Sequence, residues 1–458
     1  MTFGHARLSR FAVVAATFLF AACASGVPAS PSSSTAAQSA SAPSASVGGS
    51  SSASAPASVA PLPSEDIKGQ SITVMVPDWA NVPADILADF TAKTGVKVTM
   101  NVTGFDSIRD KVAVAGAAKT PLADVVEMDW TWTGQFAGAG WYEPLDNRID
   151  PAILSDMPNT TSFSTNGRPY AACYSNDFRI AAYNTDYFKK GGVTTPPATF
   201  DQLLTALRAI KSSGATKYPL AIPLSATEGT SSAWFLLTTA MGGKLIDDTG
   251  QPAFTDPASP GYKAFDFLVS AYKEGLISPG AVAPDADAAN TFNAGAAAVT
   301  LTSGPDELVT GNDPKTSKIV GKVAYMLEPG LTGPGGTIGS PEGLGIMASS
   351  THKAAAAAFI SWWMQPETLK KIQAKLGLLP CRASVIKDLI SSKTLVGGDI
   401  LSQQLSSLQP LFPNGAPVWY NQFSTDASSQ LNAAARGDLS VADAIQRLAD
   451  DTKSLIGG

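Results

Sequence analysis

Residues 72–102, ITVMVPDWANVPADILADFTAKTGVKVTMNV, contain two strand-like segments separated by a helix-like one. Residues 72–76 are apolar and rich in β-branched side chains, and residues 96–102 alternate apolar with polar side chains, which is typical of strands. Between them Pro83 starts a run of apolar residues at helical spacing, and Gly95 stands where that helix should end. The order strand, helix, strand favours a parallel sheet covered by helices.

The same alternation continues toward the C-terminus. A helical stretch over residues 108–117 precedes a third strand over residues 124–128. Further helices are expected after the capping box at Thr199, over residues 355–364 and 367–376, and after Ser440. The fold class is therefore α/β. In doubly wound sheets ligands bind beyond the carboxyl ends of the strands, which here are followed by loops that begin at Asp78 and Asp129.

The N-terminus has the organisation of a secretory signal peptide. A basic start is followed by an apolar run over residues 11–20 and by small residues before Cys23. Residues 19–23 resemble a bacterial lipobox, in which the cysteine receives a lipid and becomes the new N-terminus. We therefore expect a signal peptide over residues 1–22 and lipidation of Cys23. A signal peptide that is cleaved without lipidation stays the alternative.

The segment after the lipobox is expected to be a tether. With the lipidated cysteine it makes up residues 23–64, and from residue 24 onward it contains no charged and no aromatic residue. Such a composition cannot bury enough apolar surface to offset the entropy lost on ordering, so we expect a flexible linker with a reach of roughly 35 Å.

Composition excludes several classes of function. The 458 residues are enough for two domains, and the net charge of −6 without a basic stripe argues against a nucleic-acid partner. Once the N-terminal segment is removed, His352 is the remaining histidine, which excludes a multi-histidine zinc site. We expect His352 at the surface, and neither a metal nor a cofactor. No later segment offers about 18 uninterrupted apolar residues, so the body is expected to be soluble.

Four stretches, in this order along the chain, resemble segments of the bacterial extracellular solute-binding proteins, in the sugar-binding group. They are residues 122–145, 182–200, 292–298 and 377–382. The second is the most specific, with AYNTDYFKKGG at residues 182–192 followed by PPATF at 196–200. Together the four stretches cover most of the expected folded body.

The resemblance implies a two-lobed fold in which each lobe is a mostly parallel sheet flanked by helices, hinged by crossover strands. One lobe would contain residues 67–172 and 345–380, and the other residues 173–344 and 381–458. It also implies a monomeric lipoprotein outside the cytoplasm that captures a mono- or oligosaccharide between the lobes. The partners would be the membrane permease subunits of an ABC importer, and the lipid membrane through the anchor only.

A sugar needs aromatic rings for its C–H faces and polar side chains for its hydroxyl groups. The expected loops supply both kinds, at positions that resemble the places where members of the family contact sugar. The candidates are Asp78, Trp79, Asp129, Trp130, Trp132, Tyr174, Asp177, Glu228, Trp234, Asp306, Arg382, Trp419 and Tyr420.

Two alternatives remain at this point. Glu127 and Asp129 lie two residues apart on one strand, roughly 7 Å from each other, a spacing that could suit the two carboxyl groups of a secreted glycosidase. A binding protein for a polyol, a glycerol phosphate ester or an osmolyte is the second alternative. A phosphate ligand would favour clustered Arg or Lys, whereas these loops carry Asp and Trp.

Two cysteines remain after Cys23 is set aside for the lipid. Cys173 and Cys381 lie in stretches that, in the resembling family, both belong to the crossover between lobes. Disulfides persist outside the cytoplasm, so we expect these two residues to be bonded. Two separate buried thiols are the alternative.

Overall fold

The computed structural model describes residues 66–247, 249–412 and 415–457. The expected signal peptide, Cys23 and the linker lie outside these ranges. Within them, no helix is both long enough and apolar enough to cross a bilayer.

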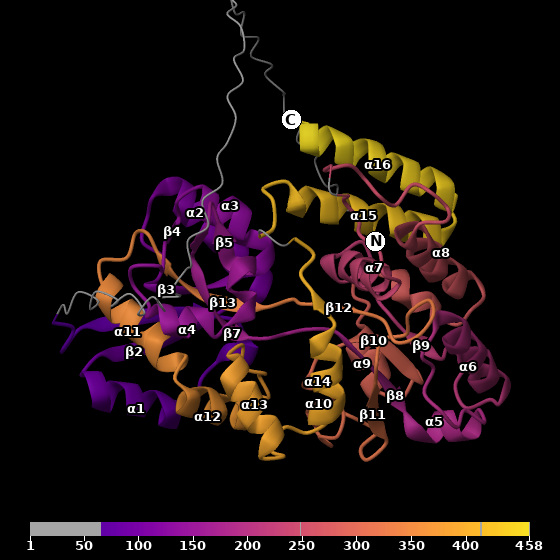
Figure 1. Ribbon diagram of the computed structural model, residues 1–458, viewed down its shortest axis with the longest axis horizontal. Helices are drawn as coiled ribbons and strands as arrows, with labels where there is room; N and C mark the ends of the chain where they lie inside the picture. Colours follow the sequence, from indigo (N-terminus) through magenta and orange to yellow (C-terminus); the bar gives the residue numbers. More distant parts are fainter. Residues whose placement is uncertain (1–65, 248, 413–414, 458) are drawn as a thin grey trace, which may run out of the picture. The chain divides into compact units, whose positions relative to one another are not determined.

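Six strands form the first sheet (Figure 1). They are β1 (Ser71–Val76), β2 (Lys97–Val102), β3 (Val125–Asp129), β4 (Tyr142–Glu143), β7 (Ala171–Ser175) and β13 (Glu342–Met347). β1 runs parallel to both β2 and β3, as the alternation of strands and helices predicted. β13 lies between β3 on one side and β4 and β7 on the other, and it runs antiparallel to all three.

Helices that pack with the first sheet or follow its strands are α1 (Ala84–Thr94), α2 (Phe105–Ala118), α3 (Thr133–Gly138), α4 (Pro151–Ser155), α11 (Lys353–Trp363) and α12 (Pro366–Leu376). α1 buries Ile86 and Phe90, and the ring of Phe90 lies 5.4 Å from that of Phe359 in α11. Gly95 follows α1 with φ of 73°, a left-handed conformation that glycine adopts without strain. The helix predicted between Pro83 and Gly95 is therefore confirmed.

The second sheet has four strands in the order β11-β8-β10-β9. They are β8 (Ile180–Asn184), β9 (Leu220–Ala221), β10 (Val299–Ser303) and β11 (Val323–Met326). The helices that accompany it are α5 (Thr185–Lys190), α6 (Phe200–Ser212), α7 (Glu228–Ala240), α8 (Pro260–Lys273), α9 (Ala288–Asn293), α10 (Glu307–Thr310), α15 (Tyr420–Arg436) and α16 (Val441–Gly457). The predicted caps hold, since the hydroxyl of Thr199 accepts from the amide of Gln202 and that of Ser440 accepts from the amide of Asp443.

The prediction that each sheet is mostly parallel was wrong. β8 pairs antiparallel with both β10 and β11, and β13 is antiparallel to its three neighbours. Neighbouring strands that run parallel need a crossover connection, usually a helix, but β8 and β13 enter their sheets directly from strands outside them. Nothing therefore constrains these two strands to the direction of the others.

Two short segments run between strands that belong to different sheets. Residues 176–179 join β7 to β8, and residues 339–341 join β12 (Thr337–Ile338) to β13. Next to them lie α13 (Ala383–Ser391), α14 (Gly398–Ser406) and β14 (Leu408–Gln409), which pairs with β12. The limits that the sequence suggested for the two lobes stay a prediction.

A disulfide joins Cys173 of β7 to Cys381, and their Cα atoms lie 5.7 Å apart. The bond ties Cys381, two residues before α13, to the strand that leads into the first linking segment. The pairing is the one that the sequence favoured.

Candidate functional site

Glu342 organises the edge of the first sheet at which β1 and β3 end. It is the first residue of β13 and lies opposite Asp129, the last residue of β3. One carboxylate oxygen, Oε2, accepts a hydrogen bond from Trp79 Nε1 at 2.7 Å and another from the Tyr174 hydroxyl at 2.8 Å. The loop after β1, the end of β3 and β7 therefore meet at this one carboxyl group.

Burial raises the pKa values of Asp129 and Glu342 above their usual range. Burial raises the pKa of Asp129 to about 7, against hydrogen bonds from Thr131 that lower it, and the charges of Glu228 and Asp177 raise it further. Burial also raises the pKa of Glu342 to about 8, with Asp177 adding to the effect. Near neutral pH both groups can therefore carry a proton and donate a hydrogen bond as well as accept one.

A second group of side chains comes from the segment after β7 and from the loop after β10. Arg179 Nη1 lies 3.0 Å from Asp177 Oδ2. A Cβ atom added at Gly304 would lie 2.7 Å from Asp306 Oδ1 and 3.2 Å from Asp177 Oδ1. The glycine therefore leaves space that the two carboxylates share, with one guanidinium group beside them.

A third group lies where α7 and α15 begin. Glu228 accepts hydrogen bonds from the Tyr420 hydroxyl at 2.6 Å and from the Ser424 hydroxyl at 2.5 Å. The ring of Tyr420 packs against that of Trp130 at 5.1 Å, so the loop after β3 contacts the start of α15. The amide of Asn421 also donates to Gln135 at 3.0 Å, which is a second contact between α15 and the first sheet's side of the site.

The three groups form one electrostatic unit, which we call the carboxyl cluster. Its members are Asp129, Asp177, Glu228, Asp306 and Glu342. The charge of Glu228 raises the pKa of Asp129, that of Asp177 raises the pKa of Glu342, and that of Asp306 raises the pKa of Asp177. Residues of both sheets are therefore close enough to influence one another.

Most of the predicted residues lie in or beside the carboxyl cluster. Trp79 is 38% exposed, with its indole nitrogen fixed by Glu342, whereas Trp130 and Tyr420 are buried against each other. Asp78 is exposed next to Trp79. Trp419 is partly buried and packs edge-on against Phe412 and Phe423.

Two predicted ligand residues, both tryptophans, lie in the core instead. Trp234 is fully buried between aromatic rings, including that of Phe235, and its indole donates to Gly261 O at 2.8 Å. Trp132 is 2% exposed, and its ring packs at a tilt against those of Phe105 and Phe136. Both rings fill core space in this structure, and their contact with a ligand stays a prediction.

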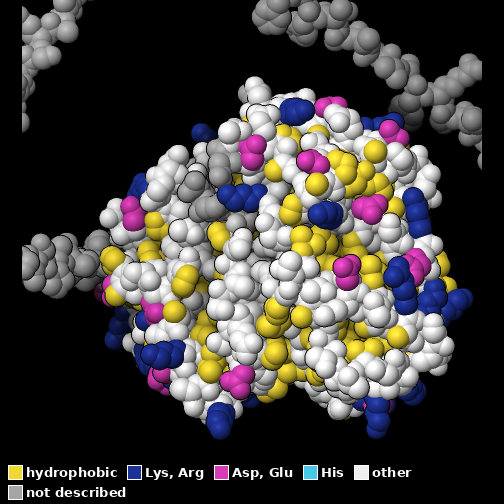
Figure 2. All heavy atoms as spheres, turned by 45° about the vertical axis from the view of Figure 1, so that its right-hand side comes forward, with side chains coloured by type: hydrophobic (Ala, Val, Ile, Leu, Met, Phe, Trp, Pro, Cys, Tyr) yellow, Lys and Arg dark blue, Asp and Glu magenta, His cyan; other side chains and the backbone are white. Residues whose placement is uncertain are grey.

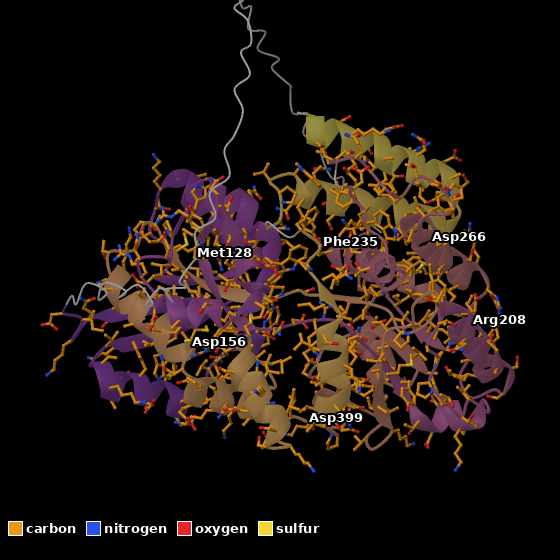
Figure 3. All side chains as sticks on the ribbon, in the orientation of Figure 1. Met128, Asp156, Arg208, Phe235, Asp266 and Asp399 are labelled. Carbon is orange, nitrogen blue, oxygen red and sulfur yellow. A yellow bond between two sulfur atoms is a disulfide. The ribbon has the colours of Figure 1, made fainter. Side chains whose placement is uncertain are left out.

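Arg382 is likewise committed elsewhere. Its guanidinium donates to Asp156 Oδ2 at 2.8 Å and to Met364 O at 3.0 Å, and the side chain is 15% exposed. Asp156, labelled in Figure 3, also accepts from the Ser384 hydroxyl at 2.5 Å. Arg382 thus fixes the start of α13 and is not free for a ligand.

Glu342 and Arg179 are not among the site residues that the sequence predicted. Glu342 begins a strand whose next residues alternate glycine with apolar side chains, a pattern that does not identify a strand. Arg179 stands two residues after Asp177, in the segment between β7 and β8. The sequence does not show that these two strands belong to different sheets, so it does not show that this segment runs past the site.

The pattern that defines the family of bacterial extracellular solute-binding proteins matches residues 76–370, which is more than half of the chain. The chain belongs to this family. Maltotriose-binding protein of Pyrococcus abyssi is 26% identical to this solute-binding protein over 299 residues, which cover 63% of this chain and 61% of that protein. The alignment thus spans about three fifths of that relative's length.

Solved structures of two other proteins resemble this solute-binding protein in fold. One is an ABC transporter solute-binding protein from Thermotoga lettingae bound with alpha-D-tagatose, with a TM-score of 0.73, 23% identity and coverage of 84% of this chain and 100% of that one. The other, from Agrobacterium radiobacter K84 in complex with ribitol, has a TM-score of 0.74, 22% identity and coverage of 85% and 100%. The fold is therefore the two-lobed α/β fold.

The family and its structural neighbours are binding proteins and not enzymes. Glu127 and Asp129, the pair of carboxyl groups that suggested a glycosidase, are also not arranged as a catalytic pair. Glu127 is fully buried, and among the described residues neither of its carboxyl oxygens has a hydrogen-bond partner. Burial raises its pKa well above the usual range, so this carboxyl group belongs to the interior of the sheet.

Proposed function

We propose that this solute-binding protein captures a carbohydrate or a polyol at the carboxyl cluster and delivers it to the permease of an ABC importer. The supporting observation is the meeting of Trp79, Glu342 and Asp129 from one sheet with Asp177, Asp306 and Glu228 from elements of the other. Exposed aromatic surface beside groups that donate and accept hydrogen bonds suits a ligand with C–H faces and hydroxyl groups.

Charge favours a neutral ligand over a phosphate ester. The carboxyl cluster contains five acidic side chains, and Arg179 is the basic side chain that pairs with it. An anion brought among these groups would meet like charge, whereas hydroxyl groups can pair with carboxylates and with protonated carboxyl groups alike. Maltotriose, tagatose and ribitol, named for the similar proteins, are all neutral and rich in hydroxyl groups.

Calorimetric titration with a panel of neutral carbohydrates and polyols tests this proposal. The panel includes maltotriose, tagatose and ribitol, with glycerol 3-phosphate as the anionic comparison. We expect one neutral compound to bind with a stoichiometry of one and the phosphate ester not to bind. Binding of glycerol 3-phosphate and of no neutral compound would contradict the proposal and would indicate a phosphate ester as the ligand.

The proposal includes a lipid anchor at Cys23 that holds the protein at the outer face of the membrane. The basic start, the apolar run and the small residues before Cys23 support it. A Cys23→Ser variant should be released from membranes or accumulate with its signal peptide uncleaved, as judged by fractionation and intact mass. Unchanged membrane association of that variant would count against the anchor.

A further inference from the structure

A cavity lies beside the disulfide. It has a volume of about 550 Å³ and is lined by residues of α13 and α14, by the short helix η3 (Pro158–Phe163), and by Asn176 and Cys381. Asp156 and Asp399, labelled in Figure 3, mark the chain just before η3 and the first turn of α14. None of the residues that line this cavity belongs to the carboxyl cluster.

The body of the cavity is apolar. Ile386 and Ile390 stand one turn apart on α13, so they share the face that lines it. Leu405 of α14 and Leu408 of β14 line it as well. A volume of this size matches the pockets that hold small organic ligands in proteins.

Two buried asparagines give the cavity a polar end. Asn159 and Asn176 are 8% and 4% exposed, and Asn159 Nδ2 donates to Asn176 Oδ1 at 2.6 Å. Among the described residues, Asn159 Oδ1 and Asn176 Nδ2 have no hydrogen-bond partner. One acceptor and one donor are therefore left over at a buried wall of the cavity, and a single hydroxyl group can satisfy both.

The side chain of Lys387 supplies a positive charge at the exposed side of the cavity. Lys387 lies between Ile386 and Ile390 on α13, lines the cavity and is exposed. Within the described ranges no carboxylate pairs with it, because Asp388 is bonded to Lys370 and Asp156 to Arg382. The positive charge at the mouth thus remains available to an anion.

We propose that this cavity binds a small carboxylate with an apolar or aromatic body and a hydroxyl group at the far end, as in phenolic acids. The carboxylate pairs with Lys387, the body lies against Ile386, Ile390 and Leu405, and the hydroxyl group bonds to Asn159 and Asn176. This ligand class differs from the hydroxyl-rich, neutral solute of the carboxyl cluster. The site therefore differs from the carboxyl cluster in its lining residues and in its chemistry.

Calorimetry on the mature full chain with 4-hydroxycinnamate as the probe tests the proposal. We expect one molecule bound per chain, and binding about fivefold weaker for cinnamate, which lacks the hydroxyl group. Lys387→Gln should weaken binding of the probe about threefold, as removal of an exposed charge does. Lys375→Gln, an exposed lysine at the end of α12 outside the cavity, is the matched control and should leave the affinity unchanged.

A substitution that fills the cavity tests whether the probe binds there or at the carboxyl cluster. Ile390→Trp should abolish binding of the probe while a solute that binds at the carboxyl cluster still binds, and that solute in excess should not displace the probe. Absence of probe binding to the folded parent protein would overturn the proposal. So would equal affinities for parent and Lys387→Gln, or displacement of the probe by the solute.

Discussion

At the scale of single residues, Trp79 and Trp234 show what a sequence can and cannot reveal about a site. Trp79 follows the first predicted strand and Trp234 follows Glu228, and both were predicted to contact a sugar. Trp79 is held at the surface by its hydrogen bond to Glu342, whereas Trp234 is enclosed by four phenylalanine rings. A single sequence does not record which way an aromatic ring turns, so the position of the loop was predictable and the role of the ring was not.

Trp79 and Trp234 should therefore respond differently to substitution. Trp79→Ala removes exposed aromatic surface at the site, and we expect solute affinity to fall about tenfold with little change in melting temperature. Trp234→Phe removes buried volume and the hydrogen bond to Gly261 O, which should lower stability by roughly 1–3 kcal/mol with affinity unchanged. Calorimetry and thermal unfolding on both variants check this, and a reversed pattern would return Trp234 to the site.

The raised pKa values of Glu342 and Asp129 predict how stability depends on pH. The folded protein keeps protons on these groups that the unfolded chain releases at lower pH. Unfolding therefore releases protons, and the free energy of unfolding should fall as pH rises from about 5 to about 8.

Glu342→Gln, which cannot ionise, should lose less stability over this pH range than the parent protein. Denaturant titrations at several pH values measure the difference. Asp266→Asn, a change at an exposed residue of α8 (Figure 3), should follow the parent profile. Parallel profiles for the parent and Glu342→Gln would show that Glu342 titrates normally.

At the scale of elements, periodicity predicted β1, α1, β2 and β3, because each depends on local sequence and on a helical crossover. β13 was not predicted. Its glycines have low strand propensity, and they are required by contacts with residues far away in the sequence. A Cβ atom at Gly345 would lie 2.5 Å from Tyr142 Cδ1, and one at Gly343 would lie 2.9 Å from Ala171 Cβ.

Gly345→Ala should accordingly destabilise the protein by about 1–3 kcal/mol through overpacking against Tyr142. Gly138→Ala is the matched control, because nothing lies within 4 Å of a Cβ atom there and α3 would gain helix propensity. Urea unfolding of the two variants provides the comparison. Equal stabilities of the Gly345→Ala and Gly138→Ala variants would contradict the close contact between residue 345 and Tyr142.

At the scale of the whole molecule, acidic and basic side chains are interspersed over the face shown in Figure 2. This agrees with the absence of a basic stripe in the sequence. The feature that unites distant parts of the chain is the disulfide, which joins residues 208 positions apart. The sequence favoured this pairing through the resemblance of two stretches, because residues so far apart leave no local signal of their proximity.

The disulfide closes a long loop, so its removal should lower stability by about 2–4 kcal/mol if the effect comes mainly from the entropy of the unfolded chain. A Cys173→Ser, Cys381→Ser double variant and thermal unfolding measure this loss. Peptide mapping without reduction should recover Cys173 linked to Cys381. Two free thiols at these positions would contradict the pairing.

The most direct test of the account is calorimetric titration of the mature protein with neutral carbohydrates and polyols, on the parent chain and on Trp79→Ala. We expect one such compound to bind the parent at a one-to-one ratio, and Trp79→Ala to bind it about tenfold more weakly. A folded parent protein that binds no member of a broad panel, or a Trp79→Ala variant that binds as well as the parent, would contradict it.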